Sequence, residues 1–97
     1  MNRLITSIDF ERYPSFLKAL GKLPIEVREQ AKAALKKLLH DPQPKSIRLE
    51  KLSGYRRPDI YTIHATSNHS HKISFELEGA CAVMRRIDTH KRIDKTP

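Results

Sequence analysis

The chain has 97 residues, of which 38% are hydrophobic and 31% are charged, and its formal net charge is +8. This length predicts one domain, residues 1–97, because two halves would each be too small to bury a core. The single cysteine, Cys81, excludes a disulfide framework and a cysteine-based zinc site. No apolar run is long enough for a membrane span or a signal peptide, so we expect a cytoplasmic protein without membrane contact. The positive charge favours a polyanionic partner, above all nucleic acid.

The first half of the chain predicts a strand followed by a helical hairpin. Residues 3–10 alternate between apolar and polar side chains well enough to form a strand. Pro14 and Pro24 suit the first turns of two helices, where a missing N–H costs nothing, and we expect these helices to end near Gly21 and His40. The apolar residues of the second helix recur on one helical face: Val27, Ala31, Ala34, Leu35 and Leu38.

The second half of the chain predicts strands, because its apolar residues alternate with polar ones. Four such runs, residues 47–52, 60–66, 71–77 and 81–87, are separated by turn residues. The last run is almost entirely apolar before its arginines, which is typical of a central strand.

The sequence thus predicts an α+β fold with an N-terminal strand, a two-helix hairpin and a four-stranded antiparallel meander. Both helices should pack on one face of the sheet, with Ile63, Phe75 and Val83 facing Leu35 and Leu38. The other face of the sheet should be open.

Basic residues and histidines are predicted on this open face and just beyond the last strand. His64 and Lys72 point outward from separate strands, strand alternation sends Arg85 and Arg86 to opposite faces, and His90 follows the strand. Metal-independent RNA cleavage requires a base, an acid and cations that stabilise charge on the phosphate. Histidine can fill either proton-transfer role, and arginine and lysine supply the charge. In neighbouring strands these groups would lie within one or two spacings of about 4.8 Å.

The same residues also allow simpler interpretations. His64 and Lys72 are compatible with a solvated strand face, and His90 with a charged tail. His69 and His71 have no third ligand at a matching spacing, so we predict neither a metal site nor a cofactor.

A basic turn provides candidate RNA contacts. Tyr55 can stack on a base while Arg56 and Arg57 hold phosphates, with Lys51 and Arg85 as further cations, although an ordinary exposed turn has the same composition.

Four short motifs follow one another along the chain: Asp41-Pro42 after the second helix, Lys51-Leu52-Ser53-Gly54 in a turn, His71-Lys72-Ile73 in a strand, and Ile87-Asp88-Thr89-His90 at the end of the last strand. Their order resembles that of the RelE/ParE superfamily of bacterial toxins from type II toxin–antitoxin modules. The resemblance covers almost the whole chain.

The resemblance implies a function and a set of site residues. RelE-like members are ribonucleases that cut messenger RNA, usually on the ribosome. By this likeness His90 would be the general acid or base, His64 a second proton-transfer group, and Lys72 and Arg86 the charge stabilisers. The chain departs from the family pattern in its His71-Lys72 pair, where Tyr-Arg is usual, and in Lys91, where some branches have tyrosine.

An alternative function stays open at this point. ParE-like members share the fold but are not enzymes, and they bind and poison DNA gyrase. Either branch implies a cognate antitoxin, encoded in the adjacent reading frame.

Overall fold

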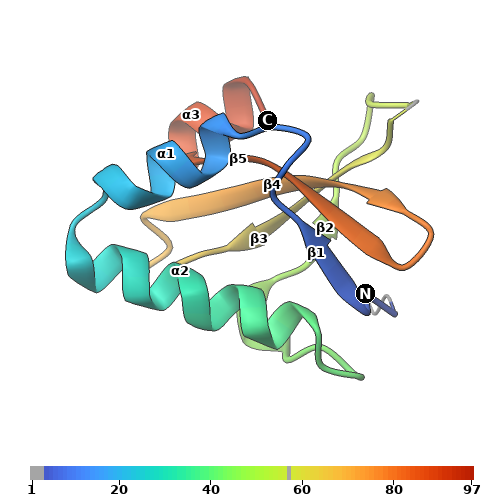
Figure 1. Cartoon of the computed structure of the whole chain (residues 1–97), viewed down its shortest axis with the longest axis horizontal. Coiled ribbons are helices and arrows are strands. Elements are labelled where there is room, and N and C mark those ends of the chain that lie inside the picture. The colour runs from blue at the N-terminus through green and yellow to red at the C-terminus, as the bar shows by residue number, and fades with distance from the viewer. Residues whose placement is uncertain (1–3, 57) are drawn as a thin grey trace.

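One sheet of five strands, in the order β1-β5-β4-β3-β2, carries the fold (Figure 1). The computed structural model describes residues 4–56 and 58–97. The elements in chain order are β1 (Ser7–Asp9), α1 (Ser15–Lys22), α2 (Ile25–Leu38), the short 3₁₀ helix η1 (Lys45–Ile47), β2 (Glu50–Lys51), β3 (Ile60–His64), β4 (His71–Glu78), β5 (Cys81–Thr89) and α3 (His90–Lys95).

The predicted meander is confirmed, and the N-terminal strand lies at its side. Strands β2 to β5 pair in antiparallel fashion in chain order, whereas β1 pairs in parallel with β5. The first strand is shorter than the predicted range of residues 3–10. Arg3, the first residue of that range, lies outside the described residues. Because β1 reaches only as far as Val83 along its partner, no strand among the described residues pairs with the rest of that edge of β5.

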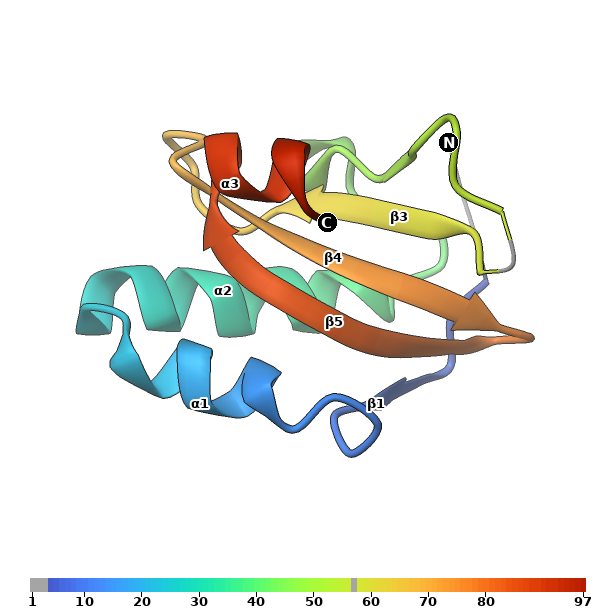
Figure 2. The same ribbon diagram turned by 90° about the horizontal axis from the view of Figure 1, so that it is seen from above.

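The predicted helical hairpin is also confirmed. Helices α1 and α2 begin directly after Pro14 and Pro24 and end at Lys22 and Leu38, close to the expected positions. They lie together on one side of the sheet, which Figure 2 shows edge-on with α3 on the other side. Their buried side chains join those of the strands in one core, whose largest fully buried members are Phe16, Phe75, Ile5, Leu38, Ile63, Ile73 and Met84.

The strand predicted over residues 47–52 is reduced to Glu50–Lys51. Ile47 ends η1 instead, and its side chain is buried in the core. Arg48 follows in the left-handed region, with φ of 48°, which interrupts an extended backbone. The alternation over residues 47–52 therefore does not mark a long strand. It reflects the burial of Ile47 at the end of a helical turn.

A β-bulge changes which residues of β5 face the helices. Phe75 pairs with Met84 and Ser74 pairs with Arg86, so Arg85 is the extra residue in β5. Val83 is the cross-strand partner of Glu76 and lies on the side away from the helical core. The prediction that Val83 faces Leu35 and Leu38 was therefore wrong, because a single inserted residue reverses the alternation along the strand.

The predicted open face of the sheet is covered by a third helix. Instead of continuing as a tail, the chain after β5 forms α3, whose Ile93 is completely buried. Helix α3 packs against β4 and β5, and Thr89 caps it by accepting a hydrogen bond from the backbone N–H of Arg92. The second face of the sheet is thus covered over part of β4 and β5.

Candidate functional site

The candidate residues meet at one end of the sheet, on the face covered by α3. His64 on β3 pairs with Lys72 on β4, and Lys72 pairs with Asp88 on β5, so these three form one row across the sheet. Cross-strand partners share a face and lie about 5 Å apart. The expected convergence of His64 and Lys72 is therefore present in the structure.

Three histidine rings gather above this row. The ring centroid of His64 lies 5.4 Å from that of His90 and 4.4 Å from that of His69, and both contacts are edge-to-face. The Nδ1 atoms of His64 and His69 are in direct contact. His69 holds this position from the β3–β4 turn with a left-handed backbone, φ 61°, a conformation in which histidine is enriched.

The environment of His64 favours its neutral form. Burial, followed by the nearby charges of His69, Lys72, His90 and Arg48, lowers the pKa of His64 to about 4. At neutral pH this imidazole is therefore uncharged and can accept a proton.

His90 occupies the first position of α3 and stays accessible. Its backbone N–H donates a hydrogen bond to the carbonyl oxygen of Ser70, at 2.9 Å, which ties the start of α3 to the β3–β4 turn. Its side chain is 43% exposed. The ring of His90 therefore lies against that of His64, and the segment that carries it is a helix rather than the charged tail that the sequence also allowed.

Lys72 is buried, contrary to the expectation that it faces solvent. Its side chain is only 5% exposed, and Nζ donates a hydrogen bond of 2.8 Å to Oδ1 of Asp94. This bond, together with the positive charge of Lys72, keeps the pKa of the Asp94 carboxyl below its usual value. The charge of Lys72 is therefore already paired with a carboxylate on α3.

Arg85 and Arg86 both lie on the α3 side of the sheet, because the bulge places them consecutively on one face. The prediction that they point to opposite faces was wrong for the same reason. Arg86 donates hydrogen bonds to the carbonyl oxygen of Thr96 and, at 3.2 Å, to Asp88. The side chain of Arg86 remains 37% exposed. Arg86 pairs with Ser74, two residues along β4 from Lys72, the cross-strand partner of His64.

Arg85 belongs to a separate ionic cluster farther along the sheet. Its Nη1 lies 2.5 Å from the buried carboxylate of Glu76, and its guanidinium lies over the ring of Tyr13. The hydroxyl of Tyr13 donates to the same carboxylate at 2.5 Å. Because a buried carboxylate needs such partners, Arg85 has a structural role in addition to its predicted RNA contact.

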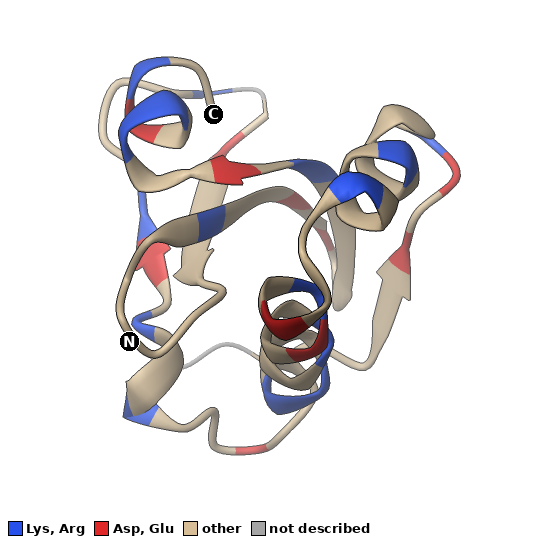
Figure 3. Ribbon diagram, turned by 90° about the vertical axis from the view of Figure 1, so that its left-hand side faces the viewer, with Lys and Arg blue, Asp and Glu red and all other residues tan. Residues whose placement is uncertain are grey.

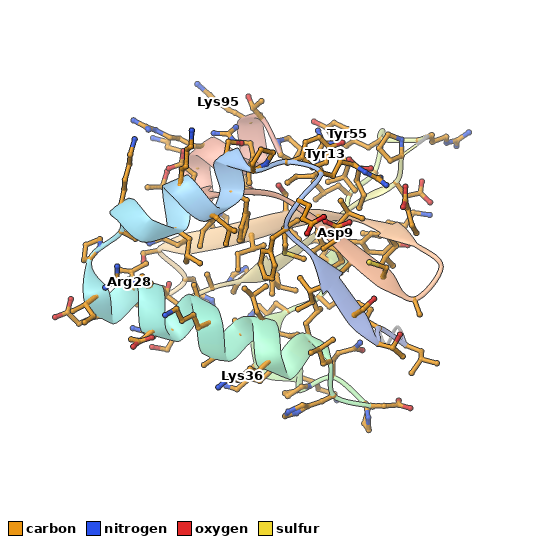
Figure 4. The ribbon with its side chains drawn as sticks, in the orientation of Figure 1. Asp9, Tyr13, Arg28, Lys36, Tyr55 and Lys95 are labelled. Atoms are coloured by element: carbon orange, nitrogen blue, oxygen red, sulfur yellow. The ribbon has the colours of Figure 1, made fainter. Side chains whose placement is uncertain are left out.

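The predicted RNA-binding turn forms the wall of two shallow hollows. One, of about 790 Å³, is lined in part by Lys51, Tyr55 and Arg56. The other, of about 390 Å³, is bounded by Tyr55, Arg56, Arg85 and Lys95, so it connects the turn to the end of α3. Figure 4 shows Tyr55 and Lys95 on the same side of the molecule, away from the α2 residues Arg28 and Lys36. Arg57 was also predicted here but lies outside the described residues.

Positive charge by itself does not single out this site. Figure 3 shows Lys and Arg on all the helices, with acidic residues between them. What distinguishes the site is the contact between the His64 and His90 rings, with the partly exposed Arg86 on the same face of the sheet.

Metal ligands are not grouped at this site in the part of the chain that the structure describes. Within residues 4–56 and 58–97, no set of three histidine, cysteine or acidic side chains has a geometry that holds a metal ion. Nor does any helix in those ranges combine the length and apolar character needed to cross a membrane.

Two residues of the site were not predicted from the sequence. Asp94 contacts both Lys72 and His90, and His69 contacts His64. Asp94 follows His90 by four residues, and this i,i+4 spacing is a detectable signal once the tail is assigned to a helix. No comparable signal indicated His69, because its contact depends on the conformation of the turn.

Comparison with solved structures shows which known fold this is. The chain aligns with a chain of the RelB-RelE antitoxin-toxin complex from Methanococcus jannaschii, with a TM-score of 0.63 and 24% sequence identity over 86% of this chain and 94% of that chain. It aligns with a chain of the archaeal RelE-RelB complex from Pyrococcus horikoshii OT3, with a TM-score of 0.65 and 15% identity over 93% and 99% of the two chains. No profile of a known protein family matches, and no curated protein is significantly similar in sequence. The α+β fold with a mixed five-stranded sheet is therefore the RelE fold.

Proposed function

We propose that this chain is the toxin of a type II toxin–antitoxin pair and that it cleaves messenger RNA without a metal ion. The observation that carries the proposal is the contact between His64 and His90, two imidazoles from distant parts of the chain, on the face of the sheet that also carries the accessible Arg86. Two proton-transfer groups and a cation are the components that cleavage by the neighbouring 2′-hydroxyl requires. The RelE fold supports the same function.

The two histidines are suited to different roles. His64 is neutral at physiological pH, because burial lowers its pKa to about 4, and it is the candidate base that takes the proton from the 2′-hydroxyl. His90 is more exposed, and its Nδ1 lies 2.9 Å from the carboxylate of Asp94. It is the candidate acid that protonates the departing 5′-oxygen.

The cations complete the proposed site. Arg86 offers a guanidinium at the surface, where it can bind the non-bridging oxygens of the phosphate as charge develops on them. Lys72 adds positive charge from beneath α3.

The basic turn provides a path for the rest of the RNA strand. The hollow that joins Tyr55 and Arg56 to Lys95 leads towards α3, and Lys95 is about 7.5 Å from His90 along the helix axis. Tyr55 is 37% exposed and can stack on a base, while Arg56 and Lys95 bind phosphates on either side.

We further propose a protein partner of the antitoxin class. Both aligned structures are complexes of RelE with RelB. A partner with an acidic segment would complement the net charge of +8 of this chain and cover its basic surface. A toxin that acts on messenger RNA, on the ribosome or free, would work in the cytoplasm.

The test is a cleavage assay with purified protein, RNA and a chelator of divalent metals. The expected products carry a 2′,3′-cyclic phosphate on one side of the cut and a free 5′-hydroxyl on the other. A parallel DNA supercoiling assay tests the gyrase alternative. Intact RNA together with inhibited gyrase would replace the ribonuclease proposal with gyrase poisoning.

A further inference from the structure

We infer that Asp94 is a positioning residue, whose carboxylate sets the orientation and the proton arrangement of His90 while it holds the buried Lys72. This inference rests on the RNA cleavage proposed above and assigns a role to a residue that does not itself contact the RNA.

The geometry assigns one carboxylate oxygen to each neighbour. Oδ1 of Asp94 accepts a hydrogen bond of 2.8 Å from Nζ of Lys72. Oδ2 lies 2.9 Å from Nδ1 of His90. A single side chain on α3 thus joins the candidate acid to a cation on β4.

The contact with His90 determines which ring nitrogen is available for chemistry. Oδ2 of the ionised carboxylate lies 2.9 Å from Nδ1 of His90, and this close contact favours the ring form in which Nδ1 carries the proton, because an unprotonated nitrogen would bring two lone pairs together. The other nitrogen, Nε2, is then the one that can exchange a proton with the substrate.

The backbone around Asp94 keeps this arrangement in place. The start of α3 is tied to the sheet through the His90–Ser70 hydrogen bond, and the middle of the helix is anchored by the fully buried Ile93. Because Asp94 directly follows the buried Ile93, the docked helix holds its carboxylate next to Lys72.

Most exposed ion pairs contribute little, but this one involves a buried cation. The side chain of Lys72 is 5% exposed, and removing the partner of a buried charge is costly. A purely structural role for Asp94 is thus the competing explanation. The experiment must therefore measure which nitrogen of the His90 ring carries the proton.

The other ionisable groups that face this pair are few. The ring of His64 on β3 contacts that of His90, His69 in the β3–β4 turn contacts His64, and Asp88 pairs with Lys72 in the same row of the sheet. His64 is neutral at physiological pH, so Lys72 is the main positive charge that acts on Asp94.

The variant Asp94→Asn separates the two explanations. Asparagine has the same shape but only one acceptor oxygen, and the buried Lys72 requires that oxygen. The amide NH₂ group then faces Nδ1 of His90 and favours a ring whose proton is on Nε2. The matched control is Glu78→Gln, which changes an exposed carboxylate about 20 Å from Lys72 along β4.

The first measurement is the tautomer of the neutral His90 ring, obtained from ¹⁵N NMR shifts at alkaline pH. The parent and Glu78→Gln should carry the proton on Nδ1, and Asp94→Asn should carry it on Nε2. An unchanged tautomer in Asp94→Asn would overturn the inference.

The second measurement is RNA cleavage under single-turnover conditions. Asp94→Asn should lose on the order of 10–100-fold in rate, with RNA affinity changed less than about twofold, as for other residues that orient a working group. A rate equal to or above that of the parent would show that Asp94 does not position His90 for catalysis. If the parent itself leaves RNA intact, the proposed function fails, and the tautomer comparison still decides what Asp94 does.

Discussion

His64 at the end of β3 and His90 at the start of α3 lie edge to face, with ring centroids 5.4 Å apart. The contact exists because the backbone N–H of His90 bonds to Ser70, which returns the chain after β5 to the turn that follows β3. It brings together two imidazoles in different environments, one half-buried and neutral and one exposed beside a carboxylate. Such pairs are where separate acid and base roles are found.

His90→Ala should abolish RNA cleavage without unfolding the protein. Loss of one proton-transfer group costs on the order of 10²–10⁴ in rate. The exposed His90 ring supports little of the core, and its backbone hydrogen bond to Ser70 survives in alanine. Cleavage rate, growth arrest and antitoxin binding should be measured beside His40→Ala, a control at an exposed position after α2. Cleavage by His90→Ala within a few-fold of the parent would refute the assignment, and His64 would be tested next.

The protein should lose stability as the pH falls from about 6.5 towards 4. In this window an unfolded chain binds a proton on His64, whereas the folded chain, in which the His64 pKa is about 4, does not. The urea midpoint should therefore decrease across the window and show no further contribution from His64 below it. The decrease should be smaller in His64→Gln and unchanged in His40→Gln. Equal pH dependence in the parent and His64→Gln would contradict the burial of a neutral imidazole.

Arg56→Gln should weaken RNA binding uniformly across sequences. Arg56 lines both hollows beside the basic turn and is expected to bind phosphate rather than a base edge. Each lost phosphate contact lowers the slope of log affinity against log salt by about 0.7 for a single strand. Fluorescence anisotropy at several salt concentrations measures this slope, with Lys18→Gln on α1 as the control. RNA binding by the parent that does not respond to salt would indicate that this surface binds a protein instead.

Ile93→Ala should destabilise the protein by about 2–5 kcal/mol, which is typical for truncating a fully buried isoleucine. The reason is that Ile93 is the buried anchor of α3, and its loss weakens the docking of the helix whose Asp94 pairs with the buried Lys72. Urea denaturation measures the effect, and Ile25→Ala is the matched control, since Ile25 is 59% exposed. A change below about 0.5 kcal/mol in Ile93→Ala would mean that α3 is not docked in solution.

Much of the fold could be predicted because its signals are local. Pro14 and Pro24 mark the starts of α1 and α2, and the helical spacing of Ala31, Leu35 and Leu38 identifies the face that is buried. Alternation along β3 likewise predicted that Tyr61 and Ile63 face the core. The candidate site was predictable only in part: the residue types and their strands were clear, but neither Asp94 nor His69 was recognised.

The sequence by itself determined the elements, their order and the basic character of the chain, because periodicity, proline positions and charge depend only on neighbouring residues. Tertiary structure alone decided three further features. The bulge at Arg85 put both arginines on one face and Val83 on the side of Glu76, because an inserted residue is defined only by pairing with another strand. The docking of α3 through Ile93 closed the face predicted to be open, because a helix of six residues is stable only when it packs on something. Finally, the burial of Lys72 against Asp94 depends on that docking, since the charge of one residue is set by the partner that the folded chain brings to it.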